Sequence, residues 1–86
     1  MAAPARAWFR FHGDLNDHLP PEQQNREVVK EFLLPASVKD MIESLGAPHP
    51  EVYTILVNDE PSDFSRLILN GDRVEVFGIA QRRGHR

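Results

Sequence analysis

Apolar residues recur with a period of two, imperfectly in the second case, along three segments of the chain, and a fourth segment is apolar almost throughout. These patterns predict four β-strands. The strands are expected near residues 7–12, 27–33, 52–58 and 73–77. In the first of them Phe9 and Phe11 share one face, and in the last Val74 and Val76 do the same. On one face of the second strand Lys30 lies between Val28 and Phe32, a pattern typical of a strand at the edge of a sheet.

One segment follows the helical period instead. Apolar residues recur at i, i+3, i+4 and i+7 within Ser37–Leu45, which predicts a helix with one apolar stripe. Ser37 is a favourable N-cap, and Gly46 suits the left-handed residue that follows a helix. A helix this short is not stable alone in water, so we expect it to pack on the sheet.

Together these elements predict an α+β domain with the order ββαββ. A mixed sheet of about four strands is covered on one face by the single helix, with the first and last strands as parallel neighbours in its middle. This arrangement is that of the β-grasp, or ubiquitin-like, fold. The expected core comprises Phe9, Phe11, Val38, Met41, Ile42, Leu45, Ile55, Val57, Leu67, Leu69, Val74 and Val76.

The composition is that of one small globular domain, since the 86 residues are 41% hydrophobic and 27% charged. The chain contains no cysteine, which excludes disulfides, thiol catalysis and cysteine-ligated zinc. We expect a flexible N-terminus over residues 1–6, the domain over residues 7–77 and a flexible basic tail over residues 78–86. No signal peptide and no membrane span is visible, so we expect a cytoplasmic monomer with no membrane partner.

Charge is distributed unevenly along the chain. The net charge is −3, yet three of the ten basic residues lie in the tail, at Arg82, Arg83 and Arg86. Residues 1–81 therefore carry 7 basic and 13 acidic residues. Because an acidic body is unfavourable for binding nucleic acid, RNA is kept only as the weaker alternative to a protein partner.

Four phrases of the sequence resemble one known family. They are FRFHGDLNDHLPPE, SVKDMIESLGAPHPEV, ILVNDEPSDFS and LNGDRVEV, which together span most of residues 7–77. In this order they are similar to the ubiquitin-like domain of bacterial Mut-seven-C proteins, which precedes a zinc-ribbon-bearing RNase module of the PIN type. The resemblance implies a β-grasp fold and an association with an RNase or RNA-processing protein. The family is itself similar in fold to the sulfur carriers of molybdopterin and thiamine synthesis.

A sulfur carrier is therefore the alternative function. Such carriers need a C-terminal Gly-Gly, because only an end without side chains can enter the activating enzyme and be attacked there. The present sequence ends in His85 and Arg86, with a single glycine nearby at Gly84. The expected function is instead a non-catalytic binding module that uses no cofactor.

The outward face of the predicted sheet is the candidate contact surface. Aromatic residues and arginine are enriched at binding hot spots, and the alternation along the strands places both types on this face. We expect a protein partner or an adjacent RNase domain to bind there through Trp8, Arg10, Leu56, Arg73 and Phe77.

Metal binding and catalysis have less support. Two histidines and two aspartates lie within seven residues, at His12, Asp14, Asp17 and His18. Their spacing matches no known metal motif, and a polar turn is the simpler interpretation. No catalytic or phosphate-binding motif surrounds any serine, carboxylate or glycine, so we assign no catalytic residue and no metal ligand.

Overall fold

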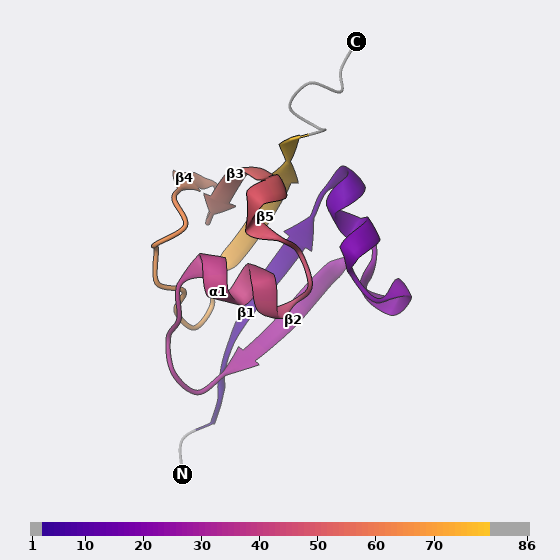
Figure 1. The fold of residues 1–86 in the computed structure, drawn as a ribbon. Coiled ribbons are helices and arrows are strands. Elements are labelled where there is room, and N and C mark those ends of the chain that lie inside the picture. Colours follow the sequence, from indigo (N-terminus) through magenta and orange to yellow (C-terminus); the bar gives the residue numbers. More distant parts are fainter. Residues whose placement is uncertain (1–2, 80–86) are drawn as a thin grey trace.

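The computed structural model describes residues 3–79, which form a five-stranded mixed sheet with one α-helix on one face (Figure 1). The strands are β1 (Ala5–Phe11), β2 (Glu27–Phe32), β3 (Val52–Val57), β4 (Glu60–Ser62) and β5 (Arg73–Gly78), and the helix is α1 (Val38–Ser44). Short 3-10 helices lie in the connections, at Gly13–His18, Pro21–Gln23 and His49–Glu51. This is the α+β, ubiquitin-like arrangement that the order of the periodic segments predicts.

The first and last strands of the chain lie side by side at the centre of the sheet, whose order is β2-β1-β5-β3-β4. β1 and β5 are parallel, and the remaining pairs of neighbouring strands are antiparallel. The pairing confirms that the first and last strands are parallel neighbours in the middle of the sheet. The sheet has one strand more than expected, because β4 contains only three residues around Pro61 and is too short to show an alternating pattern.

Helix α1 begins and ends where its capping residues predict. The Asp40 amide donates a hydrogen bond of 3.1 Å to the Ser37 hydroxyl, which satisfies one of the free amides at the helix start. After the helix, Gly46 has a φ of 116°, and a Cβ there would lie 2.7 Å from the carbonyl oxygen of His18. Only glycine fits this position, so the helix end packs directly against the connection between β1 and β2.

The core lies between α1 and the inner face of the sheet. Its largest fully buried side chains are Phe9, Phe11, Val38, Ile42, Val57, Ile68, Val74 and Val76. Full burial of an aliphatic or aromatic side chain contributes about 1.5–3 kcal/mol, so this layer is the main source of stability. Among the described residues, every buried side-chain nitrogen and oxygen has a hydrogen-bond partner.

Two of the expected core residues are wrong. Leu67 and Leu69 are 57% and 54% exposed, whereas Ile68 between them is completely buried. The backbone explains the difference, because Leu67 forms an isolated β-bridge with Ser37 and the Ile68 amide donates to the Ala36 carbonyl at 3.0 Å. This short bridge turns Ile68 toward the core in a segment that has no periodicity of its own.

Strand β3 contains a bulge that changes which residues face the core. The register of β3 and β5 shifts between Val52 and Thr54, where β3 has one residue more than β5. The extra residue, Tyr53, is 56% exposed, although strict alternation places it inward with Ile55. The bulge therefore allows Val52 and Ile55 both to be buried.

Candidate binding surface on the sheet face opposite the helix

The face of the sheet opposite α1 carries aromatic and charged side chains in rows set by the strand register. Two neighbouring rows across the strands are Val29–Trp8–Arg73 and Glu27–Arg10–Glu75–Leu56. The five sequence-predicted contact residues all lie on this face, because the residues before and after each of them are buried. Two are exposed, Arg10 and Arg73, and three are half-buried, Trp8, Leu56 and Phe77.

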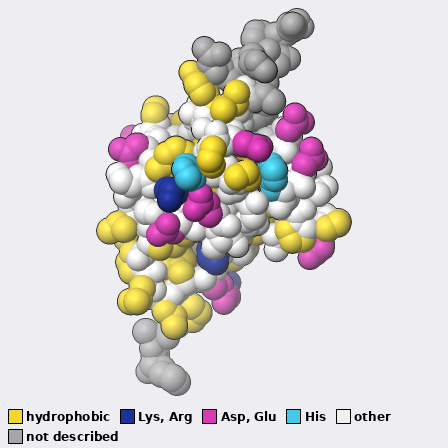
Figure 2. All heavy atoms as spheres, viewed as in Figure 1, with side chains coloured by type: hydrophobic (Ala, Val, Ile, Leu, Met, Phe, Trp, Pro, Cys, Tyr) yellow, Lys and Arg dark blue, Asp and Glu magenta, His cyan; other side chains and the backbone are white. Residues whose placement is uncertain are grey.

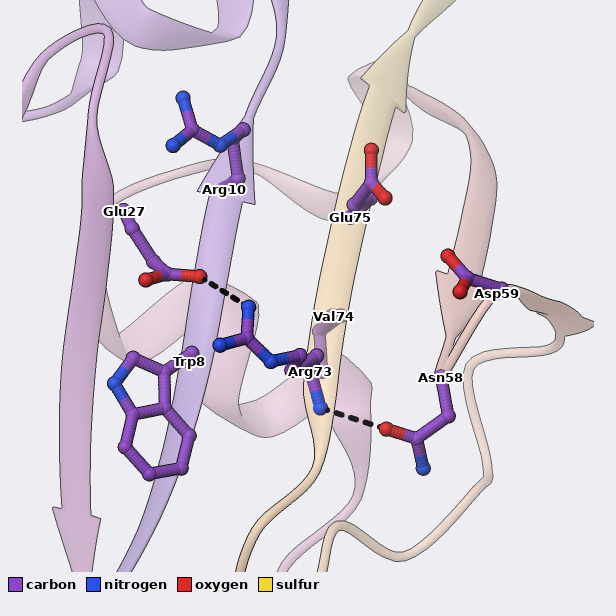
Figure 3. A pocket seen from close by; sticks show the side chains of 8 residues that line it. All are labelled: Trp8, Arg10, Glu27, Asn58, Asp59, Arg73, Val74 and Glu75. Atoms are coloured by element: carbon purple, nitrogen blue, oxygen red, sulfur yellow. Dashed lines mark hydrogen bonds and ion pairs between the residues drawn. The ribbon is translucent and has the colours of Figure 1, made fainter.

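The Arg73 side chain crosses β1 and links three strands (Figure 3). Its guanidinium carbon lies 6.0 Å from the centroid of the Trp8 ring, and its Nη1 donates to Glu27 Oε2 on β2 at 3.0 Å. Because the Arg73 side chain is 68% exposed, solvent screens this ion pair and it adds little stability. Its consequence is geometric, since it holds the guanidinium beside the Trp8 ring.

A second contact on the same face joins His12, just after β1, to Phe77 on β5. The two rings stack with their centroids 4.2 Å apart and their planes 2° from parallel. His12 Nε2 also lies 3.1 Å from Glu75 Oε1. The Glu75 carboxylate therefore already has a hydrogen-bond partner, as the Glu27 carboxylate has in Arg73.

Arg10 lies between these two occupied carboxylates. In the strand register its neighbours are Glu27 on one side and Glu75 on the other, and each of them is bonded to a different residue. Within residues 3–79 the Arg10 guanidinium makes no ion pair and is exposed. Arg10 is thus a cation on this face that remains available to a ligand.

Three of the five predicted residues meet around one open hollow of about 320 Å³ (Figure 3). The residues lining it are Trp8, Arg10, Glu27, Asn58, Asp59, Arg73, Val74 and Glu75. The other two predicted residues, Leu56 and Phe77, lie on the same face but do not line the hollow. The predicted contact residues that lie together at the hollow therefore come from β1 and β5.

Sequence reasoning did not identify Asn58 and Asp59 as residues that line the hollow. Both residues follow β3 and have positive φ values, of 52° and 70°, and the Asn58 side-chain oxygen accepts from the Arg73 amide at 3.0 Å. An Asn-Asp pair after an apolar strand is a recognisable turn signal. Its position beside the hollow depends on the pairing of β3 with β5, which no local pattern encodes.

The hollow carries charge of both signs. Its lining includes two arginines and three carboxylates, those of Glu27, Asp59 and Glu75, so negative charge is in excess. The phosphates of a nucleic acid would meet these carboxylates, and a contact through phosphates requires net positive charge.

The histidines and aspartates near the end of β1 do not form a metal site. His12 is directed to Glu75, whereas His18 Nε2 lies 2.9 Å from Glu51 Oε1. In the part of the chain that the structure describes, no group of three or more His, Asp or Glu side chains could hold a metal ion.

No helix within that part is long and apolar enough to cross a membrane.

The fold agrees with what comparison with known proteins finds. The family model of the Mut7-C ubiquitin domain matches residues 5–83, which is nearly the whole chain. No curated protein matches the chain. The match confirms the resemblance carried by the four sequence phrases, and the chain belongs to the Mut7-C ubiquitin family.

Proposed function

We propose that this protein is a non-catalytic binding module that contacts a partner protein through the sheet face opposite α1. The observation that carries the proposal is the hollow where the Trp8 ring, the Arg73 guanidinium and the available Arg10 side chain lie together. Tryptophan and arginine are the residue types that most often dominate binding energy at protein interfaces. The existing contacts of Arg73 reduce the conformational entropy that a partner would have to remove on binding.

The proposed partner is an RNase or another RNA-processing protein. The support is the membership of the Mut7-C ubiquitin family and the resemblance to domains that precede a PIN-type RNase module. In such an arrangement the sheet face would hold the RNase module, or a protein that delivers its RNA. The excess of carboxylates around the hollow supports contact with the protein rather than with the RNA itself.

The sulfur-carrier alternative depends on the basic tail, and residues 80–86 lie outside the described residues. Its support is the shared β-grasp fold alone. A direct test is to incubate the protein with a carrier-activating enzyme, ATP and a sulfur donor, and then to measure its intact mass. We expect no replacement of oxygen by sulfur at the C-terminus, and a gain of that mass would favour the carrier.

The binding proposal is tested by titrating the isotopically labelled protein with a purified Mut-seven-C RNase module and recording its NMR spectrum. We expect the amide signals of Trp8, Arg10, Leu56, Arg73 and Phe77 to shift. Trp8→Ala should weaken binding by at least about 1–2 kcal/mol, which is roughly 5- to 30-fold in the dissociation constant.

Tyr53→Ala is the matched control, because Tyr53 is an exposed aromatic residue of the same sheet that does not line the hollow. We expect this change to leave the dissociation constant unaltered. Signal shifts confined to α1, or equal affinities for the Trp8→Ala variant and the parent, would show that the sheet face is not the contact surface.

A further inference from the structure

The two edges of the sheet differ in how well they are protected against pairing with another strand. β4 forms one edge with only three residues, and Pro61 at its centre has no backbone N–H to offer. β2 forms the other edge with six residues and no proline. It pairs with β1 in an unbroken register from Glu27 to Phe32, without a bulge that would twist the edge away. A regular edge of this kind is a template for a further strand.

The hydrogen bonds of β1 show which way its backbone groups point. The amides of Trp8 and His12 donate toward β5, to the carbonyls of Asp72 and Val76, both at 2.9 Å. Because backbone groups alternate in direction along a strand, the groups of Phe9 point the opposite way, toward β2. The odd-numbered residues of β1 therefore make the ladder with β2.

The same alternation identifies the open groups of β2. Phe9 lies opposite Val28, and Ala7 lies opposite Lys30, so the backbone groups of Val28 and Lys30 face β1. Those of Val29 and Glu31 then point away from the sheet. No backbone group in residues 3–79 lies beyond β2 as a ladder partner, because β2 ends the strand order.

Apolar side chains accompany this open edge. Val29 is 49% exposed, and Leu33 and Leu34, directly after β2, are 80% and 79% exposed. Figure 2 shows hydrophobic side chains gathered at the lower left of the molecule, around the end of the sheet where β2 and the following loop lie in Figure 1. Exposed apolar side chains beside an open strand edge are typical of an interaction surface.

A second copy of the chain is a poor occupant of the edge. In an antiparallel pair of two β2 strands, a register centred on Lys30 places this lysine opposite itself. A register centred on Glu31 places that carboxylate opposite itself, and one centred on Val29 places Glu27 opposite Glu31 of the second copy. Like charges directly opposite each other destabilise a sheet, so the central registers all oppose self-association.

We propose that the β2 edge binds an extended segment of a partner protein as an additional strand, with the pattern basic–x–apolar–x–basic. On β2 the side chains of Glu27, Val29 and Glu31 point away from the core, so Val29 lies between two carboxylates. An apolar residue of the segment packs against Val29, and the two basic residues reach the flanking carboxylates. Backbone bonds to Val29 and Glu31 supply affinity, as in other cases of strand addition.

The two carboxylates that would receive the basic residues are already paired with arginines of this chain, and these pairs can be exchanged. Glu31 pairs with Arg6 at 3.1 Å and Glu27 with Arg73 at 3.0 Å. Exposed ion pairs of this kind contribute little free energy, so a basic residue of the incoming strand replaces or shares them at small cost. This edge adjoins the hollow, and Glu27 takes part in both.

The test uses the whole protein, isotopically labelled, and the peptide acetyl-Ser-Lys-Thr-Val-Thr-Lys-Ser-amide as the probe. We expect the peptide to slow solvent exchange of the Val29 and Glu31 amides in proportion to the fraction bound, and to give intermolecular contacts along β2. The matched peptide with glutamate in place of both lysines should bind at least tenfold more weakly. Equal binding of the two peptides, or signal shifts confined to the hollow or to α1, would overturn the proposal.

Two variants sharpen the test. Val29→Pro removes an outward amide without removing a bond to β1, and we expect it to abolish peptide binding while circular dichroism remains that of the parent. If that variant does not fold, the double variant Glu27→Lys and Glu31→Lys provides the test. It should bind the glutamate peptide more tightly than the lysine peptide. Two other outcomes contradict the proposal: a dimer of the parent with protected Val29 and Glu31 amides, or protection of these amides by an oligoribonucleotide and not by the peptide.

Discussion

The two faces of the sheet are built by the same strands but have opposite chemistry. On β1 the change occurs from one residue to the next, since Phe9 is completely buried and Arg10 is exposed. The core beneath α1 is apolar, whereas the opposite face carries aromatic rings and charged side chains, several of which form partly or largely exposed ion pairs. Apolar burial stabilises the fold, and exposed ion pairs contribute little. The residues that stabilise the fold and those that we propose to bind a partner therefore alternate along the same strands.

The largest expected effect is on the free energy of unfolding, and it tests the difference between the two faces at two adjacent positions. Phe9→Ala should lower the free energy of unfolding by about 3–5 kcal/mol, because it removes a fully buried ring and leaves a cavity. Arg10→Ala, the matched control on the opposite face, should change it by less than about 0.5 kcal/mol. Urea denaturation followed by circular dichroism measures both. Similar losses for the two variants would mean that both faces stabilise the fold.

The next effect concerns the segment before β5. Ile68→Ala should cost about 2–5 kcal/mol, because Ile68 is completely buried in the core. Leu67→Ala and Leu69→Ala remove more than half-exposed side chains and should each cost clearly less. Thermal melts of the three variants give the order. A larger loss for either leucine than for Ile68 would contradict the isolated bridge that turns this segment.

The smallest expected effect lies on the outer surface of the helical layer, where Figure 2 shows acidic, basic and histidine side chains over α1. A hydrogen bond from the His49 ring, with a further contribution from the charge of Lys39, holds the pKa of Glu43 below its usual value. Since the folded pKa is below the unfolded one, the interaction stabilises the fold above the ordinary glutamate pKa. That stabilisation is lost as the pH falls through the lowered value.

An NMR titration of the side-chain carboxyl carbons measures this pKa directly. His49→Ala should raise the pKa of Glu43 toward its usual value, because it removes the largest cause of the shift. His18→Ala is the control, since His18 pairs with Glu51 instead. An unchanged Glu43 titration in the His49→Ala variant would show that the hydrogen bond is not the cause.

Much of the fold could be predicted because its signals are local. The capping serine at Ser37, the apolar stripe of α1 and the apolar patterns of four strands each depend on neighbouring residues. The features that prediction missed depend on distant partners or on very short elements. β4 has three residues, Ile68 is positioned by a bridge, and Tyr53 is displaced by a bulge that only the pairing with β5 reveals.

The candidate site shows the same limit. Alternation was sufficient to place Trp8, Arg10 and Arg73 on one face, and the topology was sufficient to bring β1 next to β5. The particular bonds were not predictable, because Glu27 reaches Arg73 across an intervening strand. Which cation remains available to a ligand depends on those bonds, so it can be known only from the three-dimensional arrangement.

The parallel pair at the centre of the sheet has a consequence for folding during synthesis on the ribosome. β1 is synthesised long before its central partner β5, which is formed by Arg73–Gly78. The nascent chain must therefore expose Phe9 and Phe11 until β5 has left the exit tunnel. Pairings between such distant segments also make folding slower than in helical domains of similar size. A chaperone that shields the first strand during synthesis would act on the step at which this domain is most vulnerable.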